Sequence, residues 1–175
     1  MVVSHQEVLA DLNEILRRRF NSLAGYVLYS EPYVTDGDRE AVETLKTIAA
    51  EEEGFSVELG KLIEGQGGIP EVGTYDEVVA DLSYLSMPYL LRQVVKDKRA
   101  KVERDEKRLA AGVSLPQVRK VLERLTEMDR RHLEELERVN RAYSEKTAKP
   151  AAAEADTPAR SVESKSAPPK PEAQG

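Results

Sequence analysis

The chain contains no cysteine and no tryptophan, and aromatic residues make up only 5% of its 175 positions. The lack of cysteine excludes disulfides, thiolate metal sites and cysteine nucleophiles, and it is typical of a cytoplasmic protein. Because aromatic side chains are so few, aliphatic residues and alanine must fill any core. Hydrophobic residues amount to 40% of the chain, which is enough for one domain with a single core.

Long apolar runs are also missing, and the N-terminus lacks the basic-then-apolar order of a signal peptide. The formal net charge is −6. Acidic and basic residues balance from Thr147 onward, so the negative charge lies on the part of the chain before it. An acidic surface repels a phosphate backbone. We therefore expect a protein that neither crosses a membrane nor binds nucleic acid.

What the sequence does contain is helical periodicity. Four amphipathic segments are predicted as helices, at residues 4–30, 38–64, 86–112 and 114–145. Pro32 and Gly37 interrupt the first connection, and Gly112 together with the capping box that begins at Ser114 marks the last. The middle connection, residues 65–86, is much longer and has room for a short helix at 75–82. Two short connections on either side of a long one predict an all-α fold of two antiparallel hairpins joined by a crossover.

The last residues have a different composition. Residues 147–175 are rich in Ala, Pro, Glu, Lys and Ser, and Val162 is their only large aliphatic side chain. Such a segment buries too little apolar surface to offset the entropy of ordering. The sequence therefore predicts a helical domain at residues 1–146 and a disordered tail at 147–175.

Charged residues interrupt the apolar stripe of each predicted helix. Equal distance from a hairpin turn means equal height along the bundle, at about 1.5 Å per residue. Arg19 and Glu52 are equally far from the first turn, and Lys98 and Asp129 from the second. A polar layer is thus expected near the middle of the interior, which is where helical bundles build metal sites. The stripes read Val8, Leu12, Ile15, Arg19, Ser22, Tyr26; Val42, Leu45, Ala49, Glu52, Ser56, Leu59, Ile63; Leu91, Val95, Lys98, Val102, Asp105, Leu109; and Val118, Leu122, Leu125, Asp129, His132, Leu136, Val139.

The order of the hairpins, the Glu-rich run at residues 49–53 and the sequence Asp129-Arg130-Arg131-His132 resemble the ferritin-like superfamily, which includes rubrerythrins and bacterioferritins. The resemblance covers about residues 5–145. It implies a four-helix bundle in which helices one and three each give a Glu, and helices two and four each give a Glu-x-x-His, to hold two iron or manganese ions.

These ligand positions are only partly kept. The Glu of helix one falls on Arg19, and the His of helix two falls on Phe55. In helix three Lys98 takes the inward position and Asp97 lies one position away from the stripe. Glu52 matches the Glu of helix two, and Asp129 with His132 keeps the motif of helix four, with Asp in place of Glu.

The charges of these residues indicate whether the polar layer holds metal ions or ion pairs. Arg19 cannot lose its proton, so two divalent ions beside Arg19 and Lys98 would leave a large uncompensated buried charge. We therefore expect no cofactor, but a buried cluster of ion pairs, Arg19 with Glu52 and Lys98 with Asp129, and His132 one turn away. The expected role is non-catalytic, structural or in binding, with a homodimer through the bundle faces as a possible assembly. The alternative is a metal-dependent oxidoreductase or iron-handling protein that holds iron or manganese on a reduced ligand set, Glu52, Asp97, Asp129 and His132.

Overall fold

The structure is a computed structural model that describes residues 4–20, 22–30, 32–73 and 85–154. Every regular element in these ranges is a helix, which confirms the expected all-helical class. The elements are α1 (His5–Phe20), α2 (Leu23–Tyr29), the short 3-10 helix η1 (Asp36–Asp38), α3 (Arg39–Gly65), α4 (Met87–Ala110) and α5 (Pro116–Glu154). No helix among these is long and apolar enough to cross a membrane.

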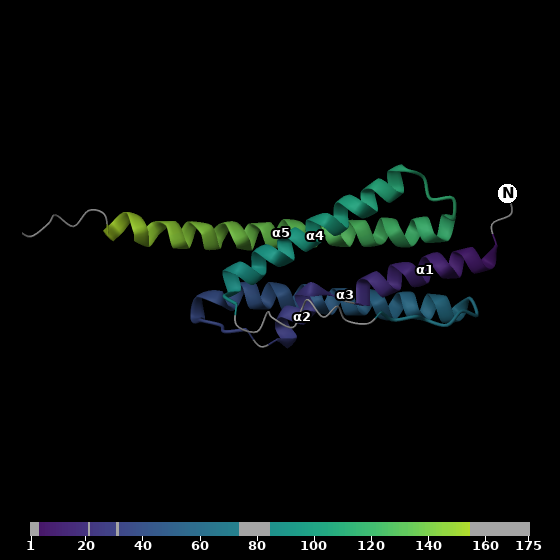
Figure 1. The fold of residues 1–175 in the computed structure, drawn as a ribbon, viewed down its shortest axis with the longest axis horizontal. Coiled ribbons are helices and arrows are strands. Elements are labelled where there is room, and N and C mark those ends of the chain that lie inside the picture. The colour runs from purple at the N-terminus through teal and green to yellow at the C-terminus, as the bar shows by residue number, and fades with distance from the viewer. Residues whose placement is uncertain (1–3, 21, 31, 74–84, 155–175) are drawn as a thin grey trace, which may run out of the picture.

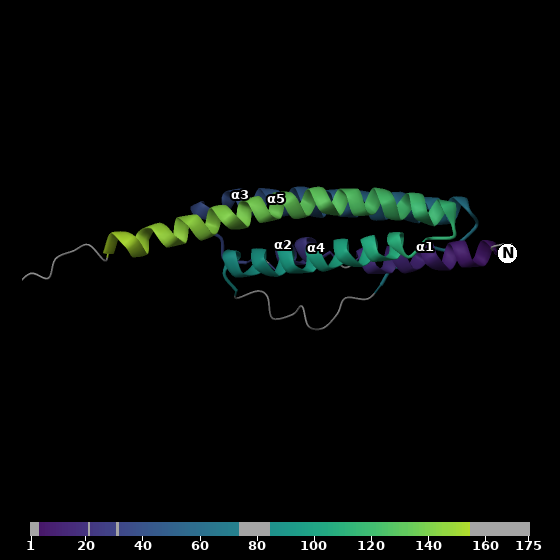
Figure 2. The ribbon, with the colours of Figure 1, turned by 90° about the horizontal axis from the view of Figure 1, so that it is seen from above.

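The helices form a long, narrow bundle (Figure 1). The consecutive helices α1 and α2 run antiparallel to α3 and pack against it, and α4 runs antiparallel to α5 and packs against it. Helix α3 ends at one end of the bundle and α4 begins at the other, as two hairpins joined by a crossover require (Figures 1 and 2). The short helix expected at 75–82 lies outside the described residues.

The first predicted helix, at residues 4–30, is two helices in the structure. Helix α1 ends at Phe20, and Ser22 caps the start of α2 with its hydroxyl, which accepts a hydrogen bond from the backbone N–H of Gly25 at 3.1 Å. A serine at an N-cap satisfies a backbone donor that a continuing helix would have used. The break places Ser22 beside α3, where it becomes part of the polar layer.

Glycine and asparagine fix the chain where it leaves α3. Gly67 has a positive φ of 74°, and a Cβ on Gly68 would lie 2.7 Å from Leu9 Cδ2. A side chain at Gly67 would strain the backbone, and one at Gly68 would require Leu9 and Ile63 to shift. The buried Asn13 of α1 then binds the following strand-like stretch twice, donating from Nδ2 to the carbonyl of Ile69 at 3.0 Å and accepting from the backbone N–H of Glu71 at 2.9 Å.

The end of the helical domain also differs from the expected one. Helix α5 was predicted to end near Glu145, but it continues to Glu154 and so includes the first part of the expected tail. Residues 151–153 are all alanine, the best helix former, whereas Pro150 in the same extension opposes a helix. Residues 155–175 of the expected tail lie outside the described part of the chain.

Two apolar clusters fill the interior, one towards each end of the bundle. The first contains Leu12, Ile15 and Leu16 of α1 with the second half of α3 and the first half of α5. The second joins α2, the first half of α3, the first half of α4 and later residues of α5, such as Leu136. The polar layer lies between them: along α3, Glu52 separates Ile48 of the second cluster from Phe55 of the first.

Candidate functional site

The site is a cluster of charged side chains that four helices bring into the interior. Helix α1 gives Arg19, α3 gives Glu52, α4 gives Lys98 and Asp105, and α5 gives Asp129 and His132. None of these six residues is more than 5% exposed. Buried charges are tolerated only when they are paired, so the contacts among them define the site. We call these six residues the polar cluster.

Lys98 lies at the centre of the polar cluster. Its ammonium nitrogen is 2.5 Å from Glu52 Oε1 and 2.8 Å from Asp129 Oδ1, so one cation bridges carboxylates from α3 and α5. The side chain is only 2% exposed. A cation that bridges two buried carboxylates is what a metal ion provides in a bundle site, and here the protein's own lysine provides it.

Arg19 makes the other two ion pairs of the cluster. One nitrogen, Nη2, is 2.5 Å from Asp105 Oδ2, and Nη1 forms an ion pair with Asp129 Oδ2. The expected Arg19–Glu52 pair is absent from the ion pairs of the described residues, because Arg19 reaches across to α4 and α5 rather than to its neighbour α3. Asp129 is thus held by two cations, Arg19 and Lys98, and is completely buried.

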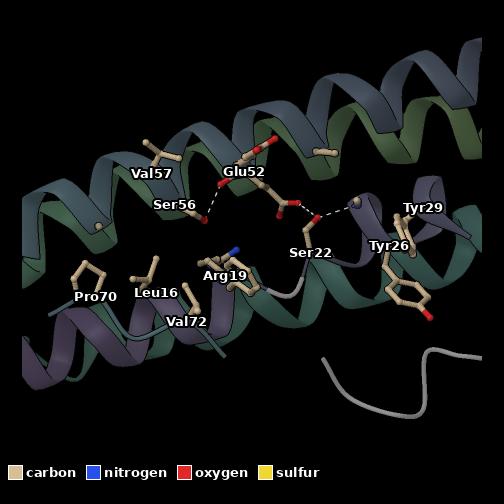
Figure 3. Close-up of a pocket in the computed structure, with 15 residues that line it drawn as sticks. Leu16, Arg19, Ser22, Tyr26, Tyr29, Glu52, Ser56, Val57, Pro70 and Val72 are labelled. Carbon is tan, nitrogen blue, oxygen red and sulfur yellow. Dashed lines mark hydrogen bonds between the residues drawn. The ribbon is translucent and has the colours of Figure 1, made fainter. Parts of the chain in front are cut away.

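Glu52 is held in its ionised form. Burial alone raises the pKa of a carboxyl group, but the charges of Lys98 and Lys101 and the hydrogen bonds from Lys98 and Ser22 outweigh it. The net result is a Glu52 pKa below its ordinary value. The hydroxyl of Ser22 donates to Oε2 (Figure 3). Because Lys98 donates to Oε1, each oxygen of Glu52 has its own donor.

His132 lies at the edge of the polar cluster and contacts a residue outside it, Glu51. Its Nε2 lies 3.0 Å from Glu51 Oε2, and because a carboxylate only accepts, a neutral His132 carries its proton on Nε2. Burial lowers the pKa of His132 below its ordinary value, although the hydrogen bond to Glu51 acts in the opposite direction. The imidazole is therefore neutral at neutral pH. Its Nδ1 is buried and has no hydrogen-bond partner among the described residues.

Asp97, the remaining candidate ligand, lies outside the polar cluster. Asp97 has a side chain that is 35% exposed, and it pairs with Lys101 one turn along α4 at 2.7 Å, away from the polar cluster. Phe55, onto which the resemblance placed a histidine, packs in the first apolar cluster. Glu52, Asp129 and His132 do come together, each offering one ligand atom within 4.8 Å of the others. These three would suffice for a single ion, but the Lys98 ammonium already contacts two of them, and the arrangement does not fit a pair of ions.

Sequence reasoning missed three participants. Asp105 was on the apolar stripe of its helix and could have been recognised as a partner for Arg19. Glu51 does not lie on the apolar stripe of its helix, yet it binds His132 and, at 3.1 Å, Arg131. Ser22 could be placed beside Glu52 only once the break between α1 and α2 was known.

A groove opens on one side of the polar cluster, between α1 and α2 on one wall and α3 on the other (Figure 3). Its volume is about 880 Å³. Apolar and aromatic side chains make up most of the lining, among them Leu16, Tyr26, Val57 and Val72, and Arg19 and Glu52 form its polar floor. Pockets of this size and character are typical of small-molecule sites.

No known family model, curated protein or solved structure matches this chain.

Proposed function

We propose that this chain is a ferritin-like bundle protein in which a buried ion-pair cluster stands where its relatives hold two metal ions, and that its role is non-catalytic, as a structural or binding protein. Two antiparallel hairpins joined by a crossover support the ferritin-like part of the proposal. The height of the polar cluster, between two apolar clusters, supports the correspondence with a metal layer.

The bridging contact of Lys98 carries the proposal. Its ammonium lies within hydrogen-bonding distance of Glu52 and Asp129, two of the three residues that offer metal-ligand atoms. A divalent ion in contact with the same oxygens would lie close to this ammonium in a dry interior, where repulsion between like charges is strong. The lysine therefore acts as a permanent counter-ion, and the protein needs no metal to balance these carboxylates.

A second candidate is a protein that binds a single iron or manganese ion. One observation favours it: Nδ1 of His132 is buried without a hydrogen-bond partner in the described structure, on a residue whose neighbours Glu52 and Asp129 also offer ligand atoms. An imidazole nitrogen with a free lone pair is a common metal ligand. This candidate requires Lys98 to leave its present position.

Metal analysis of the full chain separates the two candidates. Protein purified without chelators is expected to contain well under one iron, manganese or zinc per chain, and to show no oxidation of added iron(II). His132→Ala is the matched variant, because it removes a ligand atom and leaves both carboxylates and Lys98 in place. Stoichiometric metal in the natural protein that is lost in His132→Ala would establish the second candidate instead.

A further inference from the structure

Exposed apolar side chains gather around the groove beside the polar cluster. Eight large hydrophobic residues are exposed in the described structure, and four of them line this groove: Phe20, Tyr29, Val57 and Val72. Their exposed fractions run from 39% for Phe20 to 85% for Tyr29. Apolar residues that are scattered singly need no explanation, but a group of them around a hollow marks a place where something binds.

The interior of the groove is hollow because small residues line it. Gly25 of α2 and Ala49 of α3 face each other there, and a Cβ built on Gly25 would lie 3.9 Å from the Cβ of Ala49. Gly60 lies further along α3, where its nearest side-chain neighbour is Pro70 at the same distance. Larger side chains at these positions would fill the groove, so the sequence leaves room for an apolar guest.

The charges along the groove differ in their availability. Arg19 contributes the only positive side chain to the lining, and two aspartates, Asp105 and Asp129, already engage it. Glu52 on the floor is ionised, but Lys98 and Ser22 already engage its two oxygens. Glu53 is exposed at the groove and makes no ion pair with the described residues. Glu53 therefore gives the groove a negative charge that is unpaired in the described structure, and the aromatic rings of the lining attract cations on their faces.

We propose that the groove binds an amphipathic amine, a single-chain molecule with an apolar body and one protonated amino group. The apolar body lies between α2 and α3, and the ammonium group lies near Glu53. A carboxylate of the same length would place its charge beside the carboxylate of Glu53 and is therefore disfavoured. The volume, about 880 Å³, accommodates one such molecule. This inference gives the binding role proposed above a ligand class, and it rests on that proposal.

Calorimetric titration of the full chain with dodecylammonium, below its micelle concentration, tests this directly. We expect saturable binding of one molecule per chain, and an affinity at least about tenfold higher than for dodecanoate, the anion of the same chain length. Equal affinity for the two probes, or binding of many molecules per chain, would overturn the assignment of an amine site.

Two pairs of variants locate the site. Ala49→Phe fills the groove and should weaken dodecylammonium binding by at least about tenfold, whereas Ala50→Phe, on the exposed side of the same helix, should leave it unchanged. Glu53→Gln should weaken binding of the amine by about two- to fivefold, as expected for an exposed ion pair, and leave dodecanoate binding no weaker. Glu64→Gln makes the same change in net charge on α3 away from the groove and should have no effect.

The outcomes separate this inference from the proposed function. Circular dichroism of each variant establishes that it is folded, and metal analysis of the same preparation tests the metal-free bundle independently. A metal-free protein that binds no amine retains the proposed bundle and removes the amine site. Binding that survives Ala49→Phe in a folded protein also removes it, because the amine would then lie outside the groove.

Discussion

Replacing Lys98 by methionine removes the bridging cation of the polar cluster while keeping the length and the apolar part of the side chain. The structure shows which contacts the two carboxylates would retain. Asp129 keeps its ion pair with Arg19, but Glu52 loses its direct cation and keeps only the hydroxyl of Ser22. Glu52 is 3% exposed on the floor of the groove, so few water molecules can replace the lost ammonium.

Breaking a buried pair by removing one partner costs about 3–5 kcal/mol, and we expect Lys98→Met to lower the free energy of unfolding by this amount at pH 7. Domains are stable by roughly 5–15 kcal/mol in total, so the loss is large but leaves room for a folded variant. Urea unfolding followed by far-ultraviolet circular dichroism measures it.

A second substitution shows whether the cost comes from the unpaired carboxylate. In Lys98→Met the pKa of Glu52 should rise, because only Lys101 and Ser22 then oppose the effect of burial, and the loss of stability should shrink as the pH is lowered towards 5. Adding Glu52→Gln removes the charge and keeps an acceptor for Ser22. The double variant should therefore be more stable than Lys98→Met alone, with a coupling energy of about 1–3 kcal/mol. Additive effects of the two substitutions would refute the pairing of Lys98 with Glu52.

Three further predictions concern other parts of the account. Arg19→Met should lower the free energy of unfolding, measured with urea, by about 1–3 kcal/mol, which is less than the loss in Lys98→Met. The reason is that Asp129 keeps its contact with Lys98, and Asp105 keeps one with Arg104 at 3.4 Å. An equal or larger loss in Arg19→Met would contradict this ranking. Burial lowers the pKa of His132, so the folded protein takes up a proton less readily than the unfolded chain does. The free energy of unfolding should therefore fall as the pH drops below about 6.5. This fall should be smaller in His132→Gln, and an unchanged pH dependence would show that His132 is not responsible. Truncation after Glu154 should shift the thermal midpoint by no more than a few degrees, because the removed composition cannot form a core, and a larger drop would show that the tail packs on the bundle.

The apolar periodicity was sufficient to predict the helices, because each stripe must face a common core. It could not reveal the break between α1 and α2, since Ser22 and Tyr26 continue the stripe in phase across it. The signal was the serine itself, followed by Gly25, which together favour a new N-terminus over a continuing helix.

The composition of the polar layer could be predicted, and the expected Lys98–Asp129 pair is present at 2.8 Å, but the expected Arg19–Glu52 pair is absent from the described residues. Distance from a turn gives the height of a residue and says nothing about which helix lies opposite. Arg19 pairs with Asp105 and Asp129, both on helices of the other hairpin, and Lys98 likewise reaches Glu52 across hairpins. A rule based on single hairpins therefore assigned Arg19 to Glu52, and only the packing of all the helices could correct it.

The central claim is that the Lys98 ammonium stands in the place of a metal ion, and titration of Lys98→Ala with manganese(II) tests it most directly. Glu52, Asp129 and His132 would then offer their ligand atoms with no competing cation between the two carboxylates. Lys101→Ala is the control, since it removes a neighbouring lysine that pairs with Asp97 instead. The account predicts saturable binding of one ion by Lys98→Ala, loss of this binding when His132→Ala is added, and none in Lys101→Ala or the natural protein. Stoichiometric binding by the natural protein, or none by folded Lys98→Ala, would contradict it.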